Sequence, residues 1–212
     1  MTRKIKPVIF AFWEGESEQA YIRFLKKHFD NAAIIKPHGS AGLFETAVNA
    51  FQHNPRYLNY INATDEIWFL FDTELEKGAG WVTAFKAIKR LRRLRQTEIR
   101  IRLLMTTACF EYWLLLHYER CAPLIATPAD KERIMARIKE YVPLYKKGDQ
   151  ATTEEIAANY PIAVKNGEWT LLRLIDDNLP ELDDTDKRNG WLFKGKRTFT
   201  TVHEAIQYLT GL

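Results

Sequence analysis

Short apolar runs alternate with helical patterns through the first half of the chain. The apolar runs that predict strands are residues 7–13, 32–35, 66–71 and 99–105. Apolar residues recur at helical spacing in the segment that follows Ser17 and in residues 42–58, 81–96 and 110–119. Strand–helix alternation at this spacing predicts an α/β fold, with a mostly parallel sheet flanked by helices and joined by right-handed crossovers.

The run at residues 99–105 differs from the other three because it alternates. Its apolar positions are separated by Arg100 and Arg102. Strands buried on both faces are apolar throughout, whereas alternation is typical of a strand with one solvated face or of a sheet edge. We therefore expect this strand to lie at an edge or to have one wet face.

After residue 122 the pattern becomes helical. Helical spacing recurs in residues 131–142, 153–159, 169–179 and 202–209. The polar segments between them, which include residues 145–148 and 180–196, predict an exposed and partly mobile stretch. We expect residues 1–122 to form the α/β core and residues 123–212 to form a helical extension packed on it, within one compact domain.

Composition excludes several classes of protein. The 212 residues are 46% hydrophobic and 27% charged, which is typical of a globular protein and not of a disordered or fibrous one. No apolar run approaches the roughly 18 residues of a membrane span. The basic N-terminus precedes an apolar stretch that is too short for a signal peptide, and Cys109 and Cys121 have no metal-like spacing. A cytoplasmic location without membrane contact is expected.

The positive charge is concentrated in one segment. The whole chain has a formal net charge of +4, but residues 86–102 hold eight cations and one acid, a net +7, which leaves −3 for the rest. A basic stripe suits phosphate contact, and the candidate nucleic-acid-binding residues are Arg90, Arg92, Arg93 and Arg95, together with Lys146. The alternative is an ordinary solvated helix face, because apolar residues recur on the opposite face of the same helix.

Two of the predicted strands end in acidic residues. Glu14 follows the first strand and is followed by Glu18, and Asp72 follows the third and is followed by Glu74. The carboxyl ends of parallel strands lie at one edge of the sheet, so these acids are expected to converge. Converging carboxylates suit Mg²⁺ or Mn²⁺. The alternative is structural, because helix N-termini favour acids in their first turns.

Three sequence motifs resemble those of one protein family. Glu14-Gly15-x-x-Glu18 resembles the first motif of Toprim-type catalytic domains, and residues 72–74 resemble their Asp-x-Asp motif. Residues 109–119 are similar to the Phe-Glu-x-Trp-Leu-Leu-x-His signature of RloB-like proteins, a Toprim-related family. The matching motifs span about residues 8–148, so the resemblance implies a Toprim-like sheet for about two-thirds of the chain.

The resemblance implies an activity. Toprim sites perform phosphoryl transfer on nucleic acid, so the chain resembles a metal-dependent nuclease that hydrolyses phosphodiesters of DNA, tRNA or other RNA. Glu14 matches the acid that acts as metal ligand or general acid/base, and Asp72 and Glu74 match the metal ligands. A Glu replaces the second Asp of the motif and changes its reach, so one-metal and two-metal schemes both stay open.

The family also implies a biological setting. Its members are found beside restriction–modification genes and in abortive-infection loci, often next to a gene for an ABC-type ATPase. The resemblance therefore implies an effector of anti-phage defence that acts together with such an ATPase. The alternative is a non-catalytic subunit that binds the ATPase. A phosphatase has less support, because no Ser/Thr–Lys pair lies near the acids. The oligomeric state is open, and a homo-oligomer is among the alternatives.

Four further residues are candidates for the catalytic site. Glu18 could reach back toward a metal from the first helical turn. Glu111 either completes the acidic cluster or stabilises its helix through the helix dipole. His117 lies on the apolar helix face, where it is either a hydrogen-bonded core residue or a proton shuttle. Lys147, in a segment similar to a Tyr-x-Lys segment of the family, either neutralises charge on a scissile phosphate or belongs to a solvated loop.

Overall fold

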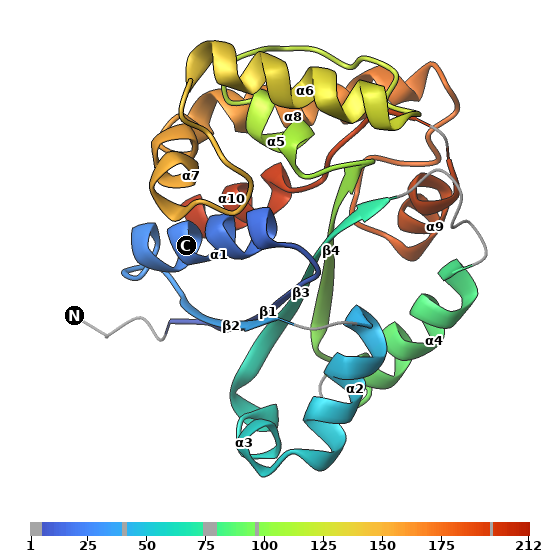
Figure 1. Cartoon of the computed structure of the whole chain (residues 1–212). Helices are drawn as coiled ribbons and strands as arrows, with labels where there is room; N and C mark the ends of the chain where they lie inside the picture. The colour runs from blue at the N-terminus through green and yellow to red at the C-terminus, as the bar shows by residue number, and fades with distance from the viewer. Residues whose placement is uncertain (1–5, 40–41, 74–79, 96–97, 196) are drawn as a thin grey trace.

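Four parallel strands form the central sheet (Figure 1). The structure is a computed structural model, and it describes residues 6–39, 42–73, 80–95, 98–195 and 197–212. The strands are β1 (Val8–Trp13), β2 (Ile34–Gly39), β3 (Thr64–Thr73) and β4 (Arg100–Thr107). Their order is β2-β1-β3-β4. The predicted α/β fold with a parallel sheet is confirmed.

Helices cover both faces of this sheet, as Figure 1 shows. On one face lie α1 (Glu16–His28), α5 (Glu111–Leu115), α6 (Pro128–Tyr141), α7 (Gln150–Ala157), α8 (Tyr160–Leu172) and α10 (His203–Thr210). On the other lie α2 (Leu43–His53), α3 (Pro55–Leu58), α4 (Trp81–Arg92) and α9 (Asp186–Lys194). Short 3-10 turns occupy Ile61–Ala63 and Arg173–Ile175.

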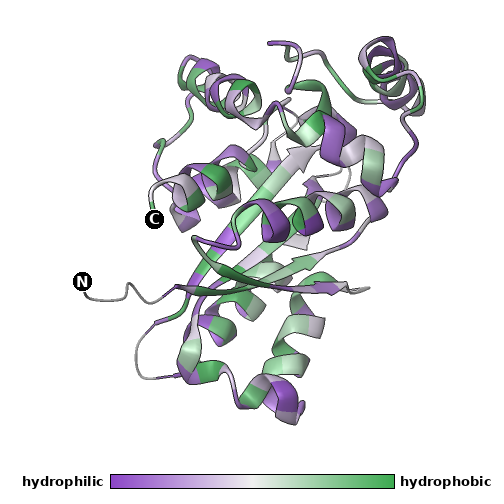
Figure 2. Cartoon of the chain, turned by 90° about the vertical axis from the view of Figure 1, so that its left-hand side faces the viewer, coloured by the Kyte–Doolittle hydropathy of each residue, from purple (hydrophilic) through white to green (hydrophobic). Residues whose placement is uncertain are grey.

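The two faces explain why the strands are apolar throughout. Successive side chains of a strand point to opposite faces, and in β1 Ile9 and Ala11 pack on the α1 side while Phe10 and Phe12 pack on the α2 side. Both sets are buried, so the sheet separates two apolar cores. Figure 2 shows the strands crossing between the helical layers above and below them.

Several predicted boundaries were wrong for local reasons. The helix expected at residues 42–58 is divided into α2 and α3, because Pro55 cannot continue a helix and the Asn54 side chain caps the next one by accepting from the Arg56 N–H. The second strand lies at Ile34–Gly39 and not at 32–35, since parallel pairing with β1 extends it into polar residues. Helix α8 begins at Tyr160, nine residues before the predicted start.

The segment at residues 180–196 was expected to be exposed and partly mobile, and the expected exposure was wrong for residues 188–190 and Leu192, which are buried. It contains α9, whose N-cap Thr185 accepts a hydrogen bond from the Arg188 N–H. The Arg188 side chain is 0% exposed and donates to Glu204 and Asp184. The polar composition of this segment therefore reflects a buried network of ion pairs around Arg188 and not solvent exposure.

β4 lies at the edge of the sheet, as its alternation predicts, but Arg102 is not on a wet face. Arg102 is buried and makes a two-point ion pair with Glu66 of β3, with distances of 3.0 and 2.9 Å. The outer edge of β4 is covered in part by the antiparallel pairing of Thr200 with Thr106. This segment lies between α9 and α10, so the C-terminal part of the chain protects an edge that would otherwise be free to pair.

The boundary proposed at residue 122 stays a prediction. The apolar core on the α1 side includes residues from both sides of that boundary, among them Trp113 and Ile138. Among the described residues, no helix is both long and apolar enough to cross a membrane.

The buried network around Arg188 gives a test of this architecture. We expect Arg188→Ala to lower the free energy of unfolding by about 3–5 kcal/mol, because it removes the cation that pairs with the largely buried carboxylate of Glu204. Urea denaturation measures this change. The control is Arg133→Ala, since that arginine pairs with Asp130 on the surface and its loss should cost about 1 kcal/mol or less. Equal losses in the two variants would contradict the proposed role of the network.

Candidate functional site

The candidate site lies at the carboxyl edge of the sheet, where the chain changes direction. From β1 the chain crosses to β2 on one side, whereas β3 lies on the other side of β1. Open parallel sheets bind ligands at such a switch point, because the connections leave a crevice between the two strand ends. Glu14 follows β1 directly, and Asp72 is the next-to-last residue of β3. The fold therefore brings these two acids to the same edge.

The first turn of α1 holds a second acid at this edge. Ser17 and Glu18 are both buried there, and Glu18 is 3% exposed. The Glu18 carboxylate folds back over Gly15, since a Cβ at that position would lie 2.5 Å from Glu18 Oε2. Glycine is therefore the residue that leaves room for this close approach. The N-terminal end of the helix also favours negative charge in its first turn.

Asp72 is a buried carboxylate whose charge is poorly compensated. Its Oδ1 is buried and has no hydrogen-bond partner among the described residues. Burial raises the pKa of Asp72 well above its usual value, and the carboxylates of Glu18 and Glu111 raise it further. An ionised carboxylate in such a place needs a proton or a nearby cation.

Glu111 joins these acids from α5. It is the first residue of that helix, and Ser17 Oγ donates a hydrogen bond of 2.7 Å to its Oε1. Its charge raises the pKa of both Glu18 and Asp72. Of the two interpretations given to Glu111 from the sequence, the geometry favours membership of the acidic cluster. We call Glu18, Asp72 and Glu111 the buried acids.

A loop from the second half of the chain brings a lysine to the buried acids. Lys147 Nζ lies 3.8 Å from Glu111 Oε1, and its side chain is 55% exposed. Partial burial works against its charged form, but the attraction of Glu111, Asp72 and Glu18 outweighs this effect and raises the pKa of Lys147. The next residue in the sequence, Gly148, has a φ of +73° and packs against Glu16 so closely that a Cβ would lie 2.5 Å from the Glu16 Cβ.

The loop is thus partly buried and not simply a solvated turn. Tyr145 is 1% exposed, whereas Lys146 is exposed. Lys147 is also exposed, and the distance of its Nζ to Glu111 is what places it beside the acids. The lysine expected from the sequence as a candidate for phosphate charge neutralisation is therefore beside the acids that would bind a metal.

Glu18 is poised to exchange a proton near neutral pH. Burial raises the pKa of Glu18 to about 7, with a further contribution from the charge of Glu111. A carboxyl group with a pKa close to the working pH is suited to general acid/base catalysis. Cys109, in contrast, is a buried thiol whose pKa rises to about 12, so it is not an activated nucleophile.

The expected metal ligands are only partly covered by the described residues. Glu74 lies outside them, and so the predicted Asp72–Glu74 pair is not described as a pair. Within the described ranges, no three His, Cys, Asp or Glu side chains form a group that could hold a metal ion. Carboxylate oxygens are nevertheless the donor type that a hard cation prefers, and the Asp72 Oδ1, on which two further carboxylates act, has no partner among the residues that the structure describes. The described residues available to such an ion are Glu14 and the buried acids, which include Asp72.

His117 is held in the core and away from solvent. It is 0% exposed, its Nδ1 lies 3.0 Å from the Trp113 carbonyl oxygen, and its Nε2 lies 3.1 Å from the Tyr21 hydroxyl. Burial lowers its pKa to about 4, so the ring is neutral at pH 7. Both ring nitrogens have partners, and these contacts support the interpretation as a core histidine over that of a proton shuttle.

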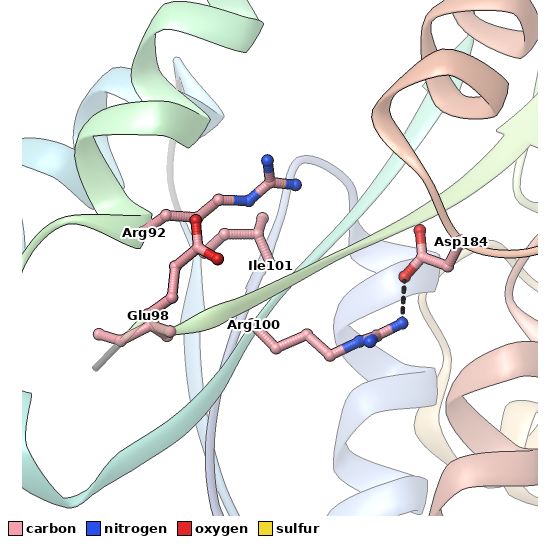
Figure 3. Close-up of a pocket in the computed structure, with 6 residues that line it drawn as sticks. Arg92, Glu98, Arg100, Ile101 and Asp184 are labelled. Carbon is pink, nitrogen blue, oxygen red and sulfur yellow. Dashed lines mark hydrogen bonds and ion pairs between the residues drawn. The ribbon is translucent and has the colours of Figure 1, made fainter.

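Much of the basic segment is neutralised within the chain. Arg92 makes a two-point ion pair with Asp186 of α9, with both distances at 2.7 Å, and Arg90 pairs with Glu45 of α2 at 3.3 Å. Arg95 donates to the Asn62 carbonyl, and Arg93 is exposed. Figure 3 shows the pocket of about 220 Å³ at the end of this segment, where Arg100 points to Asp184. The local charge of +7 is therefore reduced by acids from distant parts of the sequence.

Two residues at the site were missed by the sequence analysis. Ser17 orients Glu111, although in the sequence it looks like a helix-start residue. Tyr145 lies beside the acids, and its burial, together with the charges of Glu111 and Glu18, raises its pKa. The only sequence signal was the position of Tyr145 in the segment similar to Tyr-x-Lys. The hydrogen bond between Ser17 and Glu111 joins residues 94 positions apart, so no local sequence pattern could indicate it.

The raised pKa of Glu18 predicts a pH dependence of stability. Since the folded-state pKa of about 7 exceeds the usual 4.5, folding takes up a proton between these values, so this residue destabilises the fold increasingly as pH rises from 4.5 to 7. In EDTA, we expect Glu18→Gln to raise the free energy of unfolding at pH 7.5 by up to about 3 kcal/mol and to change it little at pH 4.5. Denaturant titrations at both pH values measure this, and Glu132→Gln on the exposed face of α6 is the control. A gain that is the same at both pH values would contradict the assignment.

The comparisons with known proteins identify the family. A family model described as RloB-like protein matches residues 9–209, nearly the whole chain. No curated protein and no solved structure shows a significant match.

Proposed function

The chain belongs to the RloB-like family, and from this premise we propose that it is a metal-dependent nuclease that hydrolyses phosphodiester bonds of nucleic acid. The observation that carries the proposal is the buried Asp72 oxygen, which has no hydrogen-bond partner among the described residues, at the switch point of the sheet and within the influence of two further carboxylates. Such an arrangement is costly for the fold alone, because like charges repel more strongly when they are removed from water. Perturbed acids in a crevice are typical of a catalytic site.

The residues have distinct proposed roles. Asp72, Glu14 and Glu74 would hold Mg²⁺ or Mn²⁺, with Glu111 completing the set. When bound, such an ion polarises the phosphoryl oxygen and lowers the pKa of a water molecule. Glu18 would hold or release a proton at its carboxyl group, which its pKa of about 7 permits near neutral pH. Lys147 would place positive charge against the phosphate as its negative charge grows.

The biological setting is also a proposal, and it rests on family membership. We infer that the chain is the effector of an anti-phage defence system and that it acts with an ABC-type ATPase. DNA, tRNA and other RNA are all candidate substrates. The test is incubation with Mn²⁺ and a panel of plasmid, single-stranded DNA and total tRNA, with and without the ATPase.

One observation favours the alternative of a non-catalytic subunit that binds the ATPase. Lys147 already lies close to Glu111 and supplies positive charge to the buried acids, which reduces their need for a metal. In that case the acids and Lys147 would form a structural cluster. Metal binding separates the two functions.

The catalytic assignment predicts that Glu14→Gln combined with Asp72→Asn reduces cleavage to background without unfolding the protein. Both changes keep the shape of the side chain and remove the charge that would hold the ion. The measurement is cleavage of the most sensitive substrate, with circular dichroism to verify folding. The matched control is Glu132→Gln combined with Asp176→Asn, two exposed acids away from the site. Cleavage at the wild-type rate by the double variant at the site would refute the assignment.

The metal assignment predicts that Mn²⁺ stabilises the fold. At a concentration near 100 times Kd, binding to the native state alone should raise Tm by about 5–10 °C. Asp72→Asn should abolish this shift, and Asp176→Asn should preserve it. Thermal unfolding and titration calorimetry measure both. Absence of Mn²⁺ binding by the wild-type chain, also with nucleic acid present, would favour the non-catalytic subunit.

A further inference from the structure

A polar groove, separate from the pocket of Figure 3, runs along the outer edge of β2 and away from the buried acids. It has a volume of about 320 Å³ and lies between α1 on one side of the strand and α3 on the other. Figure 2 views the molecule from the side on which β2 is the outermost strand. We call it the β2-edge groove, and its polar lining consists of Lys26, Lys36, His38, Arg56, Tyr57 and Tyr60.

Three cations from three different elements face this groove. Lys26 comes from α1, Lys36 from β2 and Arg56 from α3. Among the residues that the structure describes, none of the three forms an ion pair with a carboxylate, and no acid lines the groove. A set of three positive charges around one concave surface therefore has no carboxylate partner in the described part of the chain, although Lys36 contacts the Tyr60 ring.

Aromatic rings form one wall of the groove. Tyr60 is 37% exposed, and Lys36 Nζ lies 3.6 Å from the centre of its ring. In the same groove, the Tyr57 hydroxyl and His38 Nδ1 are 2.5 Å apart, and this hydrogen bond orients both rings. Burial and the positive charge of Arg56 lower the pKa of His38, so it is neutral at pH 7. The wall thus contains one accessible ring, that of Tyr60, and the hydrogen-bonded rings of Tyr57 and His38.

The contrast with the basic segment indicates which surface is free to bind an anion. In the pocket of Figure 3, Arg100 and Arg92 are held by Asp184 and Asp186. A phosphate would have to compete with these carboxylates, whereas in the β2-edge groove it would meet cations without such partners. Positive charge beside an exposed aromatic ring, here that of Tyr60, suits single-stranded nucleic acid, because its bases are free to stack.

We propose that the β2-edge groove binds a single-stranded segment of nucleic acid, with backbone phosphates against Lys26, Lys36 and Arg56 and a base against Tyr60. The three cations come from separate elements along an open groove, which suits several phosphates of a chain better than one compact anion. The proposal builds on the proposed nuclease function and assigns substrate capture to a surface separate from the buried acids.

The test measures binding without cleavage. A fluorescent ten-nucleotide single-stranded RNA and the matching DNA are titrated with the protein in EDTA, and anisotropy gives Kd at several salt concentrations. We expect Lys26→Ala combined with Arg56→Ala to weaken binding about tenfold and to reduce the salt slope by about 1.4, since each phosphate contact on a single strand contributes about 0.7. Tyr60→Ala should weaken binding about tenfold, and Tyr60→Phe should preserve it.

The control variant tests whether binding depends on the cations of the groove or on positive charge anywhere on the surface. Lys139→Ala combined with Lys165→Ala removes the same charge from exposed positions on α6 and α8, and it should leave Kd within about twofold. Wild-type affinity in the groove variants would overturn the proposal, as would an equal loss in the control. Binding of a free mononucleotide or of pyrophosphate as tightly as the ten-nucleotide strand would also overturn it, because the groove would then take a small anion.

The two proposals fail in distinguishable ways. If the variant that combines Glu14→Gln with Asp72→Asn loses cleavage but binds the single strand as tightly as the wild-type chain, the nuclease proposal and the groove proposal are both supported. Unchanged binding by the groove variants overturns the groove alone. If the wild-type chain binds no single strand in EDTA, the groove proposal is overturned, whereas the nuclease proposal still depends on cleavage with Mn²⁺.

Discussion

All four strands of the sheet run in the same direction, and helices cover both of its faces, so polar chemistry is confined to the strand ends and to the outer strands. The carboxyl edge holds the buried acids. Of the two outer strands, β4 is covered in part by the segment that contains Thr200, and β2 carries the cationic groove. The location of both candidate sites follows from this one constraint.

The signs of the buried charges distinguish the clusters that stabilise the fold from the cluster that is a candidate for function. Arg102 with Glu66, and Arg188 with Glu204, are opposite charges brought together with good hydrogen-bond geometry. The buried acids are like charges brought together, with the partly exposed Lys147 beside them. Folding alone gains little from that second arrangement, which is why it is the better indicator of function.

The second half of the chain contributes directly to both the core and the site. The loop that holds Lys147 packs on the first turn of α1, and α9 supplies Asp186 to the basic segment. The site is therefore completed by residues far from the strands in sequence. This arrangement explains why the motifs of the first 120 residues describe only part of it.

The sequence by itself determined the parallel α/β architecture and the presence of Glu14 and Asp72 at the strand ends, because continuous apolar runs and strand–helix alternation are local patterns. For β4 it left two alternatives, an edge position or one wet face. The tertiary structure decided what those patterns leave open. It showed that Ser17 bonds Glu111, that His117 has both nitrogens occupied in the core, and that much of the basic segment is paired. Each of these depends on contacts between residues distant in the chain, and such contacts form only when the layers pack.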